Sequence, residues 1–348
     1  MPRILIVAPN WIGDALMAQP MLTRLRERLP AARIDALAPA WVAPVLRRMP
    51  EIEEVIVAPF EHGELRLRRR WKFGRALRAR RYDQAIVLPN SWKSALLPFF
   101  ADIPVRCGYV GESRYGLLNL LYRASRKGVR VPMAEHYAKL AGPPREALKL
   151  PLPEPRLDVD AATVRATAER AGFAPPPAVN AVFCPGAEYG PAKRWPADHF
   201  ARLAIALATT GVRVWLLGAA GDRALCGEIA AASRGAATSL AGGTTLDEAI
   251  ELIAASAFVV TNDSGLMHVA AALDRPQVAL FGSSSAEHTP PRSARAHVAR
   301  IAIECSPCYA RECPLGHFRC MRELGVGRVL SGLEQLDVLP LARRGAAP

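Results

Sequence analysis

Residues 258–273 have the sequence FVVTNDSGLMHVAAAL, and they carry the clearest structural signal in this chain of 348 residues. A β-branched apolar run ends at Thr261, polar residues follow at 262–265, and the apolar residues from Leu266 onward have a helical composition. A short buried strand that passes directly into a helix is typical of a parallel sheet with crossover helices. We therefore predict a strand at 257–261 and a helix at 266–273.

The same alternation of short strands and amphipathic helices extends through both halves of the chain. In the second half we predict further strands at 181–184, 212–217, 237–240 and 277–281, and helices at 199–208, 223–232 and 246–255. In the first half we predict strands at 4–8, 34–38, 55–58, 84–88 and 106–110, with helices such as 22–29 and 71–80. Strands separated by helices favour one parallel sheet in each half.

Proline-rich stretches interrupt this alternation between about residues 143 and 177, and they flank one predicted helix at 161–171. Because proline restricts its own backbone and that of the preceding residue, the segment indicates a linker. The chain length suits two domains of roughly 150 residues each. We predict an α/β fold with two domains, 1–172 and 178–348, with the C-terminal tail either in the second domain or packed back on the first.

Bulk composition narrows the class of protein. Apolar residues make up 51% of the chain, yet no apolar run reaches the roughly 18 residues that a membrane-spanning helix needs. The first apolar stretch, residues 4–9, is short and leads into polar residues, which is not the pattern of a signal peptide. We expect a cytosolic protein.

Positive charge is concentrated in one segment. The formal net charge is +13, and residues 66–81 hold nine basic residues and no acidic one, with Trp71 and Phe73 among them. This pattern fits a solvated, arginine-rich helix face. It equally fits a surface for an anionic partner, which would be nucleic acid, acidic lipid head groups, or a phosphorylated or carboxylated substrate. The sequence contains no recognisable nucleic-acid-binding module.

The loop after the first predicted strand places a carboxylate, Asp14, at the start of a helix. The loop lacks the G-x-G-x-x-G spacing of a dinucleotide site, which argues against an ordinary dehydrogenase. Asp is a good helix N-cap, and its position alone favours that role. A general base would also be well held there, because a helix N-terminus favours the ionised carboxylate.

Two loops in the second half suit an anion. Residues 185–196 contain two glycines, three prolines and the basic Lys193, so that backbone N–H groups and a point charge can meet a phosphate; a tight solvent-exposed connection is the alternative. In residues 262–265, Ser264 and Gly265 fall at a helix N-terminus whose N–H groups are unpaired. Asp263 beside them can accept hydrogen bonds from sugar hydroxyls, and His268 lies about one turn along the same helix. A weaker signal is Asp222, which ends the turn after the strand 212–217 and could contact a nucleoside.

Four of the seven cysteines fall close together, at Cys305, Cys308, Cys313 and Cys320. The first pair has the C-x2-C spacing of a zinc site, but the second pair is spaced as C-x6-C, which is wider than usual. Reduced thiols in a loop are the alternative. The sequence leaves both interpretations open.

Four sequence blocks together resemble the lipopolysaccharide heptosyltransferases: WIGD at 11–14, LPNSWKSA at 88–95, PGAEYGPAKRWP at 185–196 and TNDSGLMHVA at 261–270. They occur in the same order as in that family, and the resemblance extends to about residue 300. It implies a GT-B architecture, with two Rossmann-like domains facing a cleft. It also implies an inverting transfer that needs neither a metal ion nor a cofactor. The cysteine cluster has no counterpart in that chemistry.

The resemblance assigns roles by motif and reverses the preference for a cap at Asp14, which becomes the general base for the hydroxyl of the acceptor substrate. The implied donor-binding residues are Gly186, Ala187, Lys193, Asp222, Asp263, Ser264, Gly265 and His268. The implied acceptor-binding residues are Arg69, Arg70, Lys72, Asn90 and Lys93.

The implied reaction transfers L-glycero-D-manno-heptose from ADP-heptose to the first heptose of the lipopolysaccharide inner core. The basic segment 66–81 would then face the carboxylates and phosphates of that core at the inner face of the cytoplasmic membrane, as a peripheral protein without a nucleic-acid partner. The alternatives are a heptosyltransferase acting on Kdo-lipid A, a sugar-nucleotide 2-epimerase on the same scaffold, and a nucleic-acid-binding protein.

Overall fold

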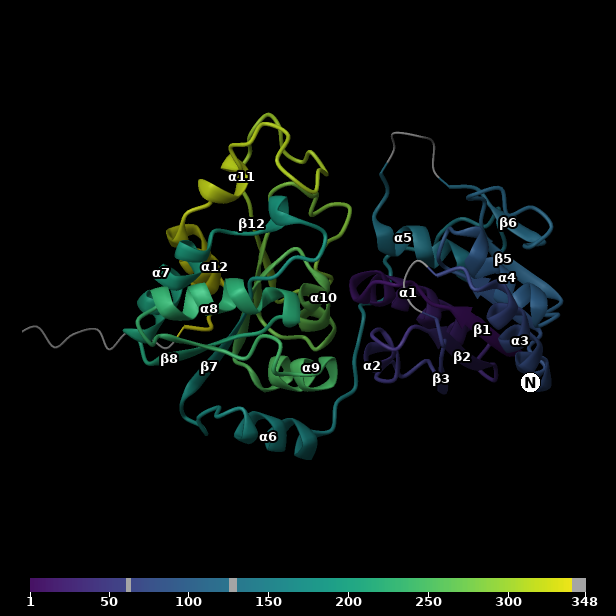
Figure 1. The fold of residues 1–348 in the computed structure, drawn as a ribbon, viewed down its shortest axis with the longest axis horizontal. Helices are drawn as coiled ribbons and strands as arrows, with labels where there is room; N and C mark the ends of the chain where they lie inside the picture. Colours follow the sequence, from purple (N-terminus) through teal and green to yellow (C-terminus); the bar gives the residue numbers. More distant parts are fainter. Residues whose placement is uncertain (61–63, 125–129, 340–348) are drawn as a thin grey trace, which may run out of the picture. The chain divides into compact units, whose positions relative to one another are not determined.

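A computed structural model describes residues 1–60, 64–124 and 130–339 (Figure 1). The chain divides into two compact units, Met1–Asp158 and Val159–Pro348. Each unit contains one six-stranded parallel sheet. The prediction of two Rossmann-like α/β domains is confirmed.

The sheet of the first unit has the order β3-β2-β1-β4-β5-β6. Its strands are β1 Arg3–Val7, β2 Arg33–Ala38, β3 Glu54–Val57, β4 Gln84–Val87, β5 Val105–Tyr109 and β6 Leu120–Tyr122. Its α-helices are α1 Ile12–Arg28, α2 Ala43–Leu46, α3 Leu67–Leu77, α4 Trp92–Phe100 and α5 Met133–Ala138. Ile4 of β1 pairs with Ile34 on one side and with Gln84 on the other, so β1 is central. The apolar run in β1 follows from burial on both faces.

The second unit repeats this topology, with the order β12-β11-β10-β7-β8-β9. Its strands are β7 Val179–Cys184, β8 Val212–Leu216, β9 Ala237–Ser239, β10 Phe258–Asn262, β11 Gln277–Leu280 and β12 Ala296–Ala299. Its α-helices are α6 Ala161–Arg170, α7 Ala197–Ala208, α8 Arg223–Ala232, α9 Leu246–Ala255, α10 Gly265–Ala272, α11 Arg319–Arg322 and α12 Val326–Gln335. Counted within its unit, each sheet has the strand order 3-2-1-4-5-6 of dinucleotide-binding folds, in which ligands bind at the carboxyl ends where the order reverses. That point lies between β1 and β4 in the first unit and between β7 and β10 in the second.

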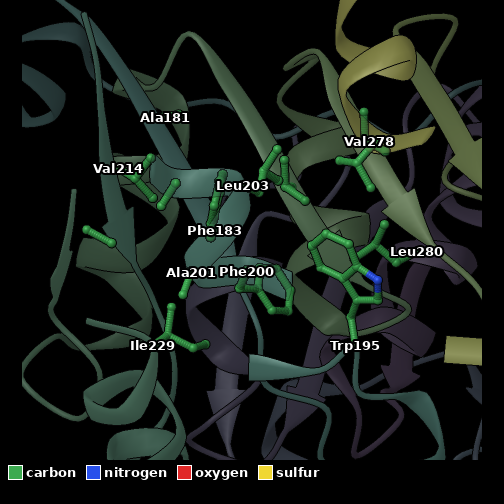
Figure 2. Close-up of a cluster of buried hydrophobic side chains, with 14 of the residues drawn as sticks. Ala181, Phe183, Trp195, Phe200, Ala201, Leu203, Val214, Ile229, Val278 and Leu280 are labelled. Carbon is green, nitrogen blue, oxygen red and sulfur yellow. The ribbon is translucent and has the colours of Figure 1, made fainter. Parts of the chain in front are cut away.

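The core of the second unit is built around a tryptophan that ends the 185–196 loop. Figure 2 shows the Trp195 ring beside Phe200 and Leu280. The rings of Trp195 and Phe200 meet edge to face, with their centroids 4.9 Å apart, and the indole Nε1–H donates to the Leu324 carbonyl oxygen at 2.7 Å. The loop is therefore anchored in the core at its C-terminal end, immediately after Lys193 and Arg194.

The segment predicted as a linker contains the boundary between the units. Helix α6 packs on α9 (Figure 1), and the Thr167 hydroxyl donates to a carboxylate oxygen of Glu251 at 2.6 Å, with both side chains buried. These contacts place α6 with the second unit, whereas the sequence interpretation counts residues up to 172 with the first. Helix α12 adds Val329 and Leu333 to the core of the second unit, so the tail belongs there through residue 339.

Within the three described ranges, no helix combines the length and the apolar composition that crossing a bilayer requires.

Candidate active site

Two loops meet at the carboxyl end of the second sheet, and one side chain ties them together. Asn262, at the end of β10, is completely buried. Its Nδ2 donates to the Pro185 carbonyl oxygen at 2.7 Å, and its Oδ1 accepts the Trp195 N–H at 3.1 Å. A buried amide that satisfies both of its polar ends in this way fixes the loop after β7 against the loop after β10.

An ion pair lies in the space that these loops enclose. Lys193 Nζ is 2.6 Å from Oδ2 of Asp263, and the hydroxyl of Ser284 donates to the same oxygen at 2.5 Å. The Asp263 side chain is 5% exposed and that of Lys193 is 16% exposed, so Asp263 is buried between two donors while the ammonium still reaches solvent. The Lys193 ammonium also lies 5.0 Å from the ring centroid of Tyr189. A partly desolvated lysine held in this way provides a fixed positive charge for an anionic ligand.

Ser284 is a site residue that the sequence analysis did not predict. It follows β11, the strand next to β10 in the sheet, in the short polar stretch 283–285. Because the carboxyl ends of neighbouring parallel strands lie at one edge, a hydroxyl-rich stretch after β11 was the available signal. The sequence analysis assigned Asp263 to sugar hydroxyls, and the structure shows its Oδ2 already bonded to Lys193 and Ser284.

Helix α10 presents its N-terminus at the same edge. Ser264 is the N-cap residue with an extended backbone (φ −146°, ψ 176°), and Gly265 is the first helical residue. The Ser264 side chain forms no capping hydrogen bond, and the first-turn N–H groups of such a helix can bind an anion. With Lys193 nearby, this end of the sheet offers both a charge and backbone donors to a phosphate group.

His268 lies beneath this cluster and carries no charge at neutral pH. Burial lowers its pKa to about 4; the negative charge of Asp263 opposes this shift, and the positive charge of Lys193 adds to it. Its imidazole therefore cannot add a second positive charge beside Lys193.

Asp222 and Gly186 fit closely together at the ends of β8 and β7. A Cβ on Gly186 would lie 2.7 Å from Oδ1 of Asp222 and closer still to Oδ2. The Asp222 carboxylate accepts the Ala219 N–H at 3.1 Å and lies 3.8 Å from a guanidinium nitrogen of Arg194. Ala187, the next predicted donor residue, is buried. These contacts fix the conformations of the loops. Because Gly186 has no side chain, its backbone can lie against the Asp222 carboxylate.

In the first unit, Asp14 lies in the first turn of α1. This helix follows β1, which borders the switch point of that sheet. The N-cap is Trp11, so the interpretation of Asp14 as the capping residue is wrong. Asp14 is hydrogen-bonded to Tyr137 of α5; burial, then the Asp14 charge and this hydrogen bond, hold the Tyr137 pKa well above its usual value. The phenol is therefore the donor, and Asp14 accepts. Tyr137 is a second residue that the sequence analysis missed, because it comes from a helix far along the chain.

A cavity of about 70 Å³ lies at the carboxyl ends of β1, β2 and β4, and Lys93 and Arg70 line it. It is far smaller than the roughly 300 Å³ of a pocket that encloses a whole ligand, so it suits one chemical group. Arg70 is buried, its Nε and Nη2 donate to the carbonyl oxygens of Leu65 and Glu64, and its guanidinium lies 4.3 Å from the Phe60 ring centroid.

The remaining predicted acceptor residues are exposed. Asn90 follows β4, and its Oδ1 lies 3.4 Å from a guanidinium nitrogen of Arg114, while Arg69 and Lys72 are on α3. The structure therefore brings Arg70 and Lys93 together at one cavity and places Arg69 and Lys72 on the outer face of α3.

No group of three or more His, Cys, Asp and Glu side chains in the described part of the chain has an arrangement that would hold a metal ion.

Comparison with known proteins agrees with this geometry. The model of glycosyltransferase family 9 (heptosyltransferase) matches residues 70–319. Lipopolysaccharide heptosyltransferase 2 of Escherichia coli is 45% identical over 96% of this chain and 98% of its own length. Lipopolysaccharide heptosyltransferase 1 of Pseudomonas aeruginosa is 28% identical over 89% of this chain and 87% of its own. The solved structure of E. coli ADP-heptose lipopolysaccharide heptosyltransferase II superposes with a TM-score of 0.85 at 43% identity, over 97% of this chain and 98% of that one. The chain therefore belongs to glycosyltransferase family 9, the heptosyltransferases.

Proposed function

We propose that this protein is a heptosyltransferase of type II, which transfers a heptose from ADP-heptose to the first heptose of the lipopolysaccharide inner core. The observation that carries the proposal is the cluster of Lys193, Asp263 and Ser284 beside the N-terminus of α10. The relative of type 2 is 45% identical over nearly the whole chain, against 28% for the relative of type 1.

The donor diphosphate binds at this cluster. Lys193 exchanges its carboxylate partner for a phosphate oxygen, and the N–H groups at Ser264 and Gly265 bind the same diphosphate. This exchange frees Asp263 for the hydroxyls of the heptose. As the bond from the anomeric carbon to the diphosphate breaks, negative charge develops on the leaving oxygen, and a preorganised ammonium and backbone donors stabilise it.

Asp14 acts on the acceptor substrate. It removes the proton from the attacking heptose hydroxyl as that oxygen forms the new bond to the anomeric carbon, and ADP leaves from the opposite face. The first turn of α1 favours the ionised carboxylate that this step requires. The hydrogen bond from Tyr137 holds the carboxylate in place.

The exposed basic face of α3 supplies the contact with the anionic inner core and with lipid head groups. Arg69 and Lys72 are exposed there, and Trp71 between them is 49% exposed. Guanidinium and ammonium groups beside an exposed indole suit an interface of phosphates and acyl chains.

Transfer from ADP-heptose to two truncated acceptors tests the reaction. One acceptor ends in Kdo and the other carries the first heptose. We expect transfer to the second acceptor only; transfer to the Kdo-terminated acceptor alone would identify an enzyme of type I. Incubation with ADP-heptose alone is the control for an epimerase, since isomerised sugar nucleotide would contradict a transferase.

Binding to vesicles tests the membrane contact. We expect binding to vesicles that contain anionic lipid, weakened by salt and by the paired change Arg69→Ala and Lys72→Ala. The matched control is Arg213→Ala, which removes an exposed arginine from β8 of the second unit. Equal binding to neutral vesicles would contradict an electrostatic contact.

A further inference from the structure

The four clustered cysteines surround a single small cavity. Cys305, Cys308, Cys313 and Cys320 all line it, although they are spread over the segment that follows β12. The cavity has a volume of about 20 Å³, which is the room that one water molecule or one ion needs. All four are free thiols, and Cys320 is the most buried of them.

Hydrogen bonds and close contacts fix several of the groups around this cavity. The Phe318 N–H donates to Cys313 Sγ at 3.4 Å. His317 Nδ1 accepts the Arg319 N–H at 3.0 Å, which orients the imidazole at the edge of the same cavity. A Cβ on Gly282 would lie 3.0 Å from Cys320 Sγ, so Cys320 is held against the loop after β11.

We propose that Cys305, Cys308, Cys313 and Cys320 bind one borderline-soft divalent metal ion, such as Zn²⁺ or Fe²⁺, in a structural tetrathiolate site. Four sulfur ligands without an open position are characteristic of structural sites for these ions. The described residues do not hold three such ligands in a finished coordinating arrangement, so binding requires the thiols to turn toward the cavity. Each thiol releases its proton to solvent as the metal–sulfur bond forms.

The metal would stabilise the donor site, because the cysteine segment braces both of its loops. The Tyr309 N–H donates to the Ser283 carbonyl oxygen at 2.6 Å, and the Ser306 hydroxyl donates to the Gly282 carbonyl oxygen at 2.7 Å. These two contacts support the stretch that carries Ser284.

On the other side of the segment, Arg311 Nε donates to the Tyr189 carbonyl oxygen at 2.7 Å, and the Arg311 carbonyl oxygen accepts the Ala192 N–H at 3.0 Å. These contacts support the stretch that carries Lys193. This consequence for donor binding rests on the proposed function, whereas the metal site itself does not.

The metal content of the full-length protein tests the proposal. We expect about one zinc or iron per chain after purification, and a sulfur-to-metal charge-transfer absorption when the site is reloaded with Co²⁺. Cys308→Ser should lower metal affinity at least tenfold, and it should raise the KM for ADP-heptose more than it lowers kcat. Cys226→Ala is the matched control, because Cys226 is a buried thiol of the same unit outside the cavity, and it should retain the metal.

Alkylation of the wild-type protein provides a second measurement that does not depend on the folding of a variant. Added Zn²⁺ should protect the cavity thiols from the reagent, and a chelator should remove that protection. A protein that contains no metal and whose thiols zinc does not protect would overturn the proposal, as would a disulfide among the four cysteines. Because neither measurement uses transfer, a metal-free protein with normal transfer would overturn only this inference, and a metal-loaded protein without transfer would overturn only the proposed function.

Discussion

Asp263 is almost completely buried; Lys193 balances its negative charge, and the Ser284 hydroxyl donates a hydrogen bond to it. Removing one partner of such a pair leaves an uncompensated charge, which is more costly than removing both. We expect Lys193→Met to lower the free energy of unfolding by about 1–3 kcal/mol, somewhat less than for a fully buried pair because Lys193 reaches solvent. The double variant Lys193→Met, Asp263→Asn should recover most of this loss, as measured by urea unfolding at pH 7.

Measurements of activity distinguish the contribution of this pair to stability from its proposed contribution to donor binding. Both variants lack the ammonium that we propose binds the diphosphate, so both should have a raised KM for ADP-heptose even though the double variant is stable. Purely additive losses of stability in the double variant would contradict the coupling between the two side chains.

Asp14 is the general base of the proposed reaction. Asp14→Asn keeps the size of the side chain and removes the base, so we expect kcat to fall by about 10²–10⁴-fold. Binding of ADP, measured by calorimetry, should remain unchanged, because the proposed donor-binding residues belong to the other unit. Tyr137→Phe should cause a smaller loss, since it removes only the hydrogen bond to the carboxylate. Normal turnover by Asp14→Asn would exclude the role of base.

His268 links the stability of the second unit to pH. Its pKa is about 4 in the folded protein and about 6.5 when unfolded, so between these values the unfolded chain binds the proton and the folded chain does not. The free energy of unfolding should therefore fall as the pH drops from about 6.5 to 4, by up to about 3 kcal/mol from this residue. His268→Gln should flatten that slope in urea titrations.

A neighbouring residue without a titrating group is the control for this slope. Val269→Ala also truncates a buried side chain of α10 and should lower stability equally at every pH. An unchanged slope in His268→Gln would show that other groups cause the loss.

At the scale of elements, the loop after β7 depends on a glycine. Gly186→Ala would place a methyl group against the Asp222 carboxylate, which the Ala219 N–H and Arg194 already hold. The loop or the carboxylate must shift, so we expect weaker ADP binding in calorimetry. Gly227→Ala in α8 is the control, since its methyl group would meet open space. That change should stabilise the helix by about 0.5–1 kcal/mol and leave binding intact. Equal ADP binding by the Gly186→Ala and Gly227→Ala variants would contradict a requirement for glycine at position 186.

The sequence predicted the elements better than it predicted the contacts between them. Apolar runs identify the central strands because burial on both faces of a parallel sheet leaves little choice of residue. The edge strands β6 and β12 have only three and four residues, and β12 includes His297, so neither has a long apolar run and neither was predicted. Ser284 and Tyr137 were missed for another reason, since their partners lie 21 residues away for Ser284 and on a separate helix for Tyr137.

One further feature of the basic segment 66–81 could have been predicted from its sequence. Arg70, Gly74 and Leu77 are the buried residues of α3, and their spacing of four and three residues marks one face of the helix. The density of charge predicts one basic surface over the whole segment, whereas this periodicity separates Arg70 from the outward-facing Arg69 and Lys72. The cation–π contact of Arg70 with Phe60 then explains how an arginine is tolerated on the inner face.

At the scale of the whole molecule, each unit has a complete parallel sheet with its own buried core. A fragment of residues 159–348 should therefore fold alone and bind ADP, because Lys193, Asp263 and α10 all lie within it. Circular dichroism and calorimetry on the isolated fragment would check both expectations. An unfolded fragment would mean that the second unit depends on the first for its stability.

The position of the boundary can be tested with a shorter fragment, residues 178–348, which lacks α6. Without α6, the buried carboxylate of Glu251 loses the Thr167 hydroxyl, and Trp215 loses the ring of Phe173, which stacks on it with centroids 5.0 Å apart. Loss of a hydrogen bond to a buried charged group costs about 1.5–3 kcal/mol, and exposure of the apolar surface under α6 adds to that. We expect the shorter fragment to melt at a lower temperature than 159–348 while it still binds ADP. Equal melting temperatures would instead assign α6 to the connection between the units, because its removal would then cost the second unit nothing.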